Sequence, residues 1–93
     1  MIKSFRCKET QKVFGRKFSK KLPSEIQEKA RIKLVILDAT ISLNDLRVPP
    51  ENRLEELIDN RKGQHSIRIN NHWRICFEWK NGDTFNVEIV DYH

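Results

Sequence analysis

The chain has 93 residues, of which 38% are hydrophobic and 33% are charged, and it carries a formal net charge of +5. This length predicts a single domain over residues 1–93, and the composition is typical of a folded, soluble protein rather than a disordered one. No apolar run is long enough to cross a membrane, no secretory signal pattern is present, and two cysteines do not make a disulfide framework. We therefore expect a reduced, cytoplasmic protein that does not enter a membrane.

The positive charge is concentrated in the first third of the chain. Residues 1–33 contain eleven Lys or Arg and three Glu, whereas residues 34–93 contain seven Lys or Arg and ten acidic residues. A basic segment of this kind favours a polyanionic partner such as nucleic acid, or an acidic protein segment. The alternative is a well-solvated helical surface.

The first part of the chain predicts an extended segment followed by two helices. Residues 1–5 are short and mixed in character, as in an edge strand or the start of a strand. The apolar spacing over residues 8–14 predicts a short helix, and a basic loop follows it. Pro23 suits the first turn of a longer helix, which should end near Thr40.

The longer helix has a start signal and an apolar stripe. Ser24 and Gln27 have the spacing of a capping box, in which two side chains bond the main chain at the start of a helix. Lys29 and Lys33 lie off the stripe. The stripe that we expect to face the core consists of Ile26, Ala30, Leu34, Leu37 and Ile41.

The middle of the chain predicts a connection and then a short strand. Pro49-Pro50 marks residues 44–52 as an ordered connection rather than a helix. Residues 53–58 fit either a helical turn or a strand, and their place between Pro-Pro and a further strand favours a short strand. A loop through residues 60–63 follows.

Residues 64–93 predict three strands joined by two tight turns. Asn70-Asn71 tolerates the positive φ of a two-residue turn, and Asn81-Gly82 is the strongest hairpin signal in the chain. Apolar and polar residues alternate strictly around these turns, which predicts one face to bury and one wet face that includes Arg74. The expected core-facing residues are Trp73, Ile75, Phe77, Trp79, Phe85, Val87 and Ile89. Together with the helices, these strands predict an α+β fold, with two N-terminal helices packed on one face of a mainly antiparallel sheet of about four strands.

Several kinds of site have no support in the sequence. The histidines and cysteines lack the paired spacings of structural zinc sites, so we expect no metal and no other cofactor. A glycine-rich phosphate loop and a nucleophile elbow are both absent, which disfavours ATP or GTP use and serine-type catalysis.

The remaining polar residues suit phosphodiester chemistry without a metal. Arginine neutralises a phosphate, histidine transfers protons near neutral pH, and tyrosine stacks on a base or donates a proton. RNA supplies its own nucleophile in the 2′-hydroxyl group. The residues are Arg68 and Arg74 of the polar face, Arg61 and Lys62 of the loop, and Tyr92 and His93 at the end of the sequence.

Each of these residues also has a simpler interpretation. Arg74 on a strand is commonly a solvated charge or an ion-pair partner of Glu78 or Glu88. His65 has the strand parity of the core-facing residues Ile67 and Ile69, so it is as typical of a satisfied, half-buried histidine as of a catalytic one. His93 is in a position where side chains are commonly frayed.

Several segments of the chain have the pattern of one protein family. The strand Trp73-Arg74-Ile75-Cys76-Phe77 and the ending Asp91-Tyr92-His93 are together quite specific, and residues 1–5, 52–55 and 61–70 also match. In these segments the chain resembles the HigB toxins, the "plasmid maintenance killer" branch of the RelE/ParE superfamily. The similarity spans nearly the whole sequence.

The resemblance implies a RelE-like microbial ribonuclease fold and a toxin of a type II toxin–antitoxin pair. Such toxins cleave mRNA in the A site of the 70S ribosome, and a helix-turn-helix antitoxin of the HigA type neutralises them. Operator DNA is then reached only through the antitoxin. Arg74, Asp91, Tyr92 and His93 match the family's functional residues.

One segment departs from the family pattern. Some members carry His-Pro-Leu-Lys, whose His and Lys contribute to activity, where this chain has residues 55–58, Glu-Glu-Leu-Ile. Glu55 is therefore a candidate general base, and Arg61 or Lys62 is a candidate cation. We predict that Arg61, Lys62, Arg68 and His65 bind RNA.

The mechanism implied for this toxin is ribosome-dependent and metal-independent cleavage. Glu55 or His93 takes the proton of the 2′-hydroxyl, Arg74 stabilises the charge that develops on phosphorus, and His93 or Tyr92 assists the leaving 5′-oxygen. Two other functions remain open: a toxin of the same superfamily that inhibits another target, such as DNA gyrase, by binding alone, and a non-enzymatic nucleic-acid-binding or regulatory module that acts with its antitoxin.

Overall fold

The computed structural model describes residues 1–58 and 63–91. In this part of the chain there are two α-helices, α1 (Lys8–Phe14) and α2 (Ser24–Ala39), and two 3₁₀ helices, η1 (Leu43–Arg47) and η2 (Pro50–Asn52). The strands form one antiparallel sheet in the order β1 (Glu55–Glu56), β2 (Gln64–Arg68), β3 (Trp73–Lys80) and β4 (Asp83–Asp91). The predicted α+β fold is confirmed.

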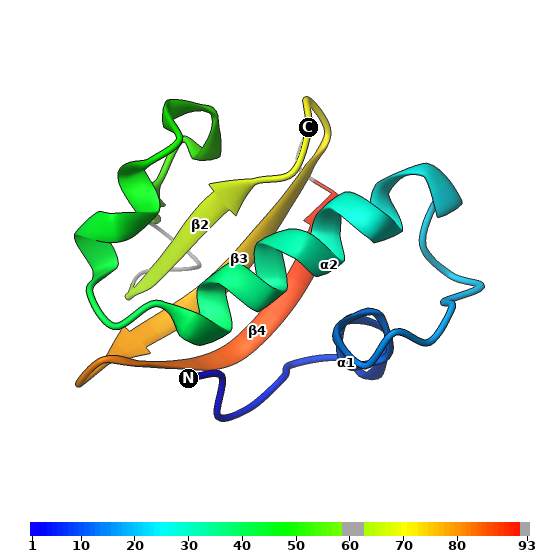
Figure 1. Ribbon diagram of the computed structural model, residues 1–93, viewed down its shortest axis with the longest axis horizontal. Coiled ribbons are helices and arrows are strands. Elements are labelled where there is room, and N and C mark those ends of the chain that lie inside the picture. The colour runs from blue at the N-terminus through cyan, green and yellow to red at the C-terminus, as the bar shows by residue number, and fades with distance from the viewer. Residues whose placement is uncertain (59–62, 92–93) are drawn as a thin grey trace.

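The two α-helices lie on the same face of the sheet, and α2 crosses in front of β3 and β4 (Figure 1). The hydrophobic core fills the space between this face and the helices. No helix of the described residues is both long enough and apolar enough to cross a membrane. The core consists of Val13, Ile26, Ala30, Leu34, Leu37, Leu46, Ile67, Ile69, Ile75, Phe77, Val87 and Ile89.

The N-terminal residues extend the sheet at its β4 edge. Ile2 forms a parallel bridge with Thr84, and Phe5 forms another with Val87. The amide of Arg6 donates a hydrogen bond of 2.9 Å to the carbonyl oxygen of Val87. The predicted edge strand at residues 1–5 therefore exists as a pair of bridges beside β4.

The start of α2 differs from the capping-box prediction. The N-cap residue is Pro23 rather than Ser24, and no side-chain hydrogen bond caps the helix there. The Gln27 amide instead donates to the carbonyl oxygens of Ser19 at 2.7 Å and Leu22 at 2.9 Å. Gln27 thus closes the loop before the helix, and the capping-box prediction was wrong because this loop folds back within its reach.

The end of α2 and the connection after it also differ from expectation. Ile41 lies beyond the helix and is 82% exposed, so it does not extend the core stripe. Lys33, which lies off that stripe, is nonetheless buried, and its Nζ donates to the side-chain oxygen of Asn52. Residues 44–52, predicted to be free of helix, mostly form the two 3₁₀ helices.

The turn between β3 and β4 has the predicted geometry, whereas the turn between β2 and β3 does not. Asn81 and Gly82 have φ values of 54° and 83°, as a two-residue hairpin turn requires. At the other turn, the amide of Ile69 donates to the carbonyl of Trp73 at 2.8 Å, which leaves a three-residue loop. Neither Asn70 nor Asn71 has a positive φ. The Asn70 side-chain oxygen accepts from the amides of His72 and Trp73, so side-chain bonding stabilises this turn.

A β-bulge in β4 changes the predicted alternation. Cys76 pairs with Glu88 and Glu78 pairs with Phe85, so β4 has one residue more than β3 between these pairs. Asn86, in the bulge, has a φ of 54°. Because one added residue reverses the facing of side chains, Phe85 shares the face of Glu78, away from the helices. The prediction that Phe85 faces the core was wrong.

Candidate active site

Arg74 lies on the sheet face opposite α1 and α2, which no helix of the described residues covers and which we call the uncovered face, and it is buried in spite of this position. The residue is 7% exposed. Nε donates to the Ser66 hydroxyl at 2.8 Å, and Nη2 donates to the main-chain oxygens of Arg53 at 2.6 Å and Ser66 at 3.4 Å. These bonds fix the plane of the guanidinium. Arg74 is therefore not the solvated charge that its place on a polar face suggested.

The carbonyl of Arg53 reaches Arg74 because of the backbone just before β1. Arg53 directly follows η2 and has a left-handed conformation, with φ 45° and ψ 56°. Asn52, which precedes it, is 1% exposed and donates to the carbonyl oxygens of Leu46 at 3.1 Å and Val48 at 3.4 Å. With the bond from Lys33, these contacts tie the Arg53 backbone to α2 and η1.

Glu55 is brought to the same place by strand pairing. It lies opposite Ser66 in the β1–β2 ladder, and its Oε2 is 3.9 Å from Nη2 of Arg74. The Glu55 side chain is 50% exposed, so solvent reaches the carboxylate but hardly reaches the guanidinium. A proton acceptor and a rigid cation thus lie side by side, although Glu55 and Arg74 were predicted from different segments.

These groups line a pocket of about 180 Å³ on the uncovered sheet face. Arg68 pairs with Arg74 in the β2–β3 ladder and stands on the same face. Its Nε donates to the Asn70 carbonyl at 3.2 Å, and its Nη2 donates to the Asn71 side-chain oxygen. The lining residues are Arg53, Glu55, Arg68, Asn70, Asn71 and Arg74. Three arginines on one small pocket make it suited to an anion such as a phosphate.

Sequence reasoning missed several residues of this pocket. Asn70 and Asn71 were interpreted as turn residues alone, and the Arg53 carbonyl has no sequence signal. Ser66 does not line the pocket but accepts from Arg74, and it had a signal, because it shares the strand parity of Arg68 on the polar face.

Other predicted site residues lie elsewhere. Asp91 is exposed at the end of β4 and pairs with Trp73, one position beyond the pair formed by Arg74 and Val90. His65 pairs with Phe77 on the core-facing side of the sheet, where the two rings stack with centroids 6.1 Å apart. The half-buried alternative describes His65 better than a place in the pocket. Arg61, Lys62, Tyr92 and His93 lie outside the described residues.

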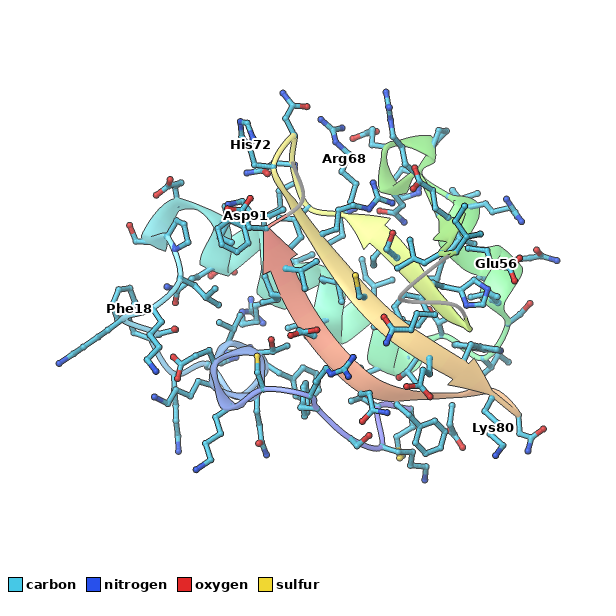
Figure 2. The ribbon with its side chains drawn as sticks, turned by 180° about the vertical axis from the view of Figure 1, so that it is seen from behind. Phe18, Glu56, Arg68, His72, Lys80 and Asp91 are labelled. Carbon is cyan, nitrogen blue, oxygen red and sulfur yellow. The ribbon has the colours of Figure 1, made fainter. Side chains whose placement is uncertain are left out.

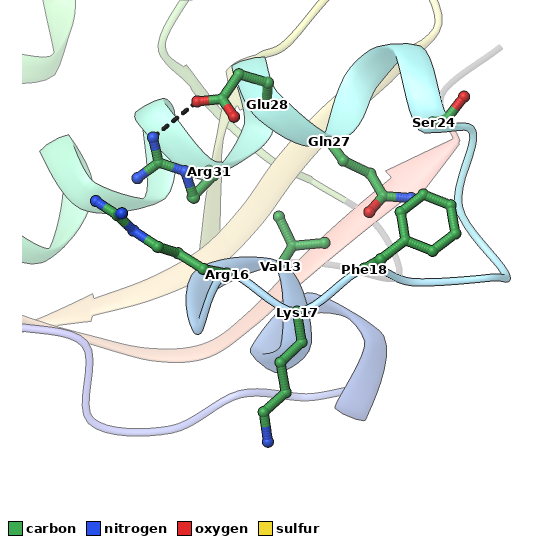
Figure 3. A pocket seen from close by; sticks show the side chains of 8 residues that line it. All are labelled: Val13, Arg16, Lys17, Phe18, Ser24, Gln27, Glu28 and Arg31. Carbon is green, nitrogen blue, oxygen red and sulfur yellow. Dashed lines mark hydrogen bonds and ion pairs between the residues drawn. The ribbon is translucent and has the colours of Figure 1, made fainter.

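A second hollow, of about 380 Å³, lies between the end of α1 and the start of α2 (Figure 3). Phe18 borders it and is 65% exposed, and the Arg31 guanidinium is 2.7 Å from the Glu28 carboxylate. Arg16 and Lys17 add positive charge at its rim. This hollow belongs to the helix layer and contains none of the predicted catalytic residues. Across residues 1–58 and 63–91, no group of three or more His, Cys, Asp or Glu is placed to hold a metal ion.

Comparison with known proteins identifies the family. Residues 3–93 match the model of the HigB-like toxin family, described as the RelE-like toxin of the type II toxin–antitoxin system HigB. The chain belongs to the HigB-like toxin family. This membership confirms the resemblance that the strand around Arg74 and the ending after Val90 indicated, and it makes the protein a type II toxin with an antitoxin as its partner.

Two relatives of this HigB-like toxin show how far the similarity in sequence extends. It is 46% identical to Toxin HigB-1 of Vibrio cholerae serotype O1 over 66 residues, which are 71% of this chain and 70% of that protein. It is 29% identical to Endoribonuclease HigB of Proteus vulgaris over 93 residues, the whole of both chains.

A solved structure supports the fold. The chain aligns with a structure of the YoeB-YefM complex from Staphylococcus aureus with a TM-score of 0.57, covering 100% of this chain and 98% of that one. At 16% identity, this similarity supports the fold alone.

Proposed function

We propose that this HigB-like toxin is an endoribonuclease that cleaves mRNA in the A site of the translating ribosome. The observation that carries the proposal is the buried guanidinium of Arg74, held rigidly beside the solvent-accessible carboxylate of Glu55 in a pocket lined by arginines. The name of the Proteus vulgaris relative, Endoribonuclease HigB, supports the same activity.

The proposed reaction uses the 2′-hydroxyl of RNA as nucleophile. Glu55, or His93 in its place, removes the proton of this hydroxyl, and the oxygen attacks the adjacent phosphorus. Arg74 stabilises the negative charge that develops on the phosphate oxygens, because a preorganised cation loses little energy to reorganisation during the reaction. The bond from phosphorus to the 5′-oxygen breaks, and His93 or Tyr92 protonates that oxygen. The products are a 2′,3′-cyclic phosphate and a 5′-hydroxyl end.

The site residues have distinct roles in this proposal. Arg68 stands on the same face as Arg74 and contacts the phosphate or its neighbour. Arg61 and Lys62, which precede β2 in the sequence, contribute further positive charge. Asp91 ends β4 one position beyond the pair of Val90 with Arg74. In this proposal Tyr92, the next residue in the sequence, stacks on the target base.

The ribosome and the antitoxin are the proposed macromolecular partners. Residues 1–33 carry eleven basic and three acidic residues and include the basic rim of the hollow between α1 and α2 (Figure 3). We assign this surface to ribosomal RNA, whose phosphates attract such charge. The antitoxin is of the HigA helix-turn-helix type, and it carries the contact with operator DNA. The site of action is the cytoplasm, where mRNA is translated.

The decisive experiment maps the 5′-hydroxyl ends of cellular mRNA after brief expression of the toxin. We expect new 5′-hydroxyl ends inside translated codons, and none with the Arg74→Ala variant. Purified toxin should give the same cuts on programmed ribosomes when a metal chelator is added at a concentration that leaves the ribosomes intact. Growth inhibition without new mRNA ends would contradict this function and would favour a toxin that acts by binding another target.

Ribosome binding gives an independent test of the basic surface. Because phosphate contacts release counterions, the affinity should fall steeply between about 50 and 200 mM salt. A salt-independent affinity would place the ribosome contact on another surface.

A further inference from the structure

The bulge in β4 removes an aromatic residue from the core and places it on the face of the active site. Phe85 pairs with Glu78, and the next pair toward the turn is Thr84 with Trp79. Thr84, fully buried, therefore takes the core-facing position that regular alternation would have given to Phe85. The main-chain amide of Asn86 donates to the Ser4 hydroxyl at 2.8 Å, so the N-terminal segment holds the bulge in place.

Phe85 borders a hollow of about 300 Å³ at the turn end of the uncovered face. Its side chain is half-buried, and it is not among the partly buried hydrophobic residues that pack against the core. The side-chain amide of Asn86 donates to Glu78 Oε2 at 2.8 Å, which sets two polar groups beside the ring. Lys80 lies at this end of the sheet, opposite the end marked by Arg68 (Figure 2). Gly63 and Trp79 complete the lining.

We propose that the hollow bordered by Phe85, Glu78 and Asn86 is a subsite for a nucleobase of single-stranded RNA. A phenylalanine ring offers a surface on which any base stacks. The Glu78 carboxylate has more acceptor positions than its bond with Asn86 uses, and Asn86 Oδ1 is a further acceptor. Acceptors select bases with an exocyclic amine, so the subsite takes adenine, cytosine or guanine in preference to uracil. Lys80 supplies positive charge for the adjoining phosphate.

The subsite lies on the path that RNA would take from the active site. Glu78 and Arg74 are on the same strand and the same face, four residues apart, which is about 13 Å along a regular strand. The base bound at Phe85 therefore belongs to a nucleotide beyond the one at the cleaved phosphate. This inference rests on the proposed function, because it adds a second contact with the same RNA strand.

A direct test measures stacking of a base on Phe85. The probe is a short single-stranded RNA that contains 2-aminopurine, whose fluorescence is quenched when it stacks on an aromatic ring. We expect quenching with the unchanged toxin and with Phe85→Tyr, and an affinity about tenfold weaker with Phe85→Leu, which keeps apolar volume but loses the ring. Phe85→Tyr is the matched control, since it keeps an aromatic ring at the same position. Equal quenching with Phe85→Leu would overturn the subsite.

A second test separates the hydrogen-bonding role from stacking. Asn86→Gly keeps a residue that tolerates the positive φ of the bulge, but it removes the side-chain amide. We expect Asn86→Gly to cleave with a weaker bias against uracil at one flanking position, as mapped on programmed ribosomes. An unchanged base profile in Asn86→Gly and in Phe85→Leu would overturn the subsite and leave the proposed function intact. Cleavage that persists in Arg74→Ala would instead overturn the proposed function, while the 2-aminopurine result would still decide the subsite.

Discussion

The guanidinium of Arg74 donates a hydrogen bond of 2.6 Å to the main-chain carbonyl oxygen of Arg53, 21 residues earlier in the chain. The two residues meet because the left-handed conformation of Arg53 turns the chain from η2 into β1. The catalytic cation we propose is thus positioned by a backbone group, which no side-chain substitution at position 53 removes. Its rigidity depends on how firmly the segment before β1 is held.

Replacing Arg74 should abolish cleavage and also weaken the fold. We expect Arg74→Ala to lower the rate of ribosome-dependent cleavage by about 100- to 1000-fold, the effect of losing one preorganised charge stabiliser. The free energy of unfolding should fall by about 1–3 kcal/mol, because acceptors on Arg53 and Ser66 lose their donor. Denaturant unfolding measures the second effect. Arg74→Lys should restore little activity, since lysine lacks the planar fork. Arg47→Ala, at an exposed arginine of η1, is the control and should leave both quantities unchanged.

Asn52 should affect catalysis without touching RNA. It is buried between Lys33 and the carbonyls of Leu46 and Val48, and it immediately precedes Arg53. Asn52→Ala should lower the free energy of unfolding by about 2 kcal/mol and lower kcat with little change in KM, because the Arg53 carbonyl loses its support. Denaturant unfolding and cleavage kinetics measure the two effects. The matched control is Asn44→Ala, at an exposed asparagine of the same connection. A kcat equal to that of the unchanged toxin would mean that Arg53 is held without Asn52.

Glu55 and its neighbour provide a direct comparison of two carboxylates. Glu55→Gln should lower the cleavage rate by about 100- to 10,000-fold if Glu55 is the general base. Glu56→Gln is the control, because Glu56 is also exposed but pairs with His65 rather than with Ser66. Single-turnover cleavage on programmed ribosomes measures both variants. Equal rates for the two would assign the general base to His93.

The last two residues, Tyr92 and His93, lie outside the described part of the structure, so their role remains a prediction from the sequence. The β3–β4 ladder runs to the pair of Asp91 with Trp73. A chain ended at Asp91 retains this ladder, and its melting temperature should change little while cleavage is lost. A large drop in the melting temperature would instead give the two residues a structural role.

The contact between α1 and the loop before α2 should make stability depend on pH in the acidic range. The Ser19 hydroxyl donates to Glu9 Oε1 at 2.5 Å, and this bond lowers the pKa of Glu9 below its ordinary value of 4.5, with further help from Lys12. A lowered pKa in the folded state means that ionised Glu9 stabilises the fold above pH 4.5, and that this contribution disappears as the pH falls through the folded-state pKa.

The test compares the unchanged toxin with Glu9→Gln and Ser19→Ala by denaturant unfolding from pH 7 to the acid limit of folding. Near neutral pH both variants should be less stable than the unchanged toxin. The difference should shrink progressively once the pH is below 4.5. A difference that stays constant would show that the Glu9 carboxylate does not gain from this bond.

The sequence by itself determined the elements whose signals are local. The helix over residues 8–14, the end of the second helix near Thr40 and the Asn81-Gly82 turn were all predicted, because spacing, capping and turn preferences act within a few residues. The family pattern likewise identified Arg74, and the departure from that pattern at residues 55–58 pointed to Glu55. These two members of the pocket lie 3.9 Å apart.

Only the tertiary structure decided which side chains meet and which face they occupy. The bulge at Asn86 is set by pairing with β3 and by the hydroxyl of Ser4, 82 residues away, so alternation alone placed Phe85 on the wrong face. The burial of Arg74 likewise depends on the Arg53 carbonyl, which carries no sequence signal. Facing and burial are properties of pairing between distant segments, and a pattern read along one strand contains no information about its partner's register.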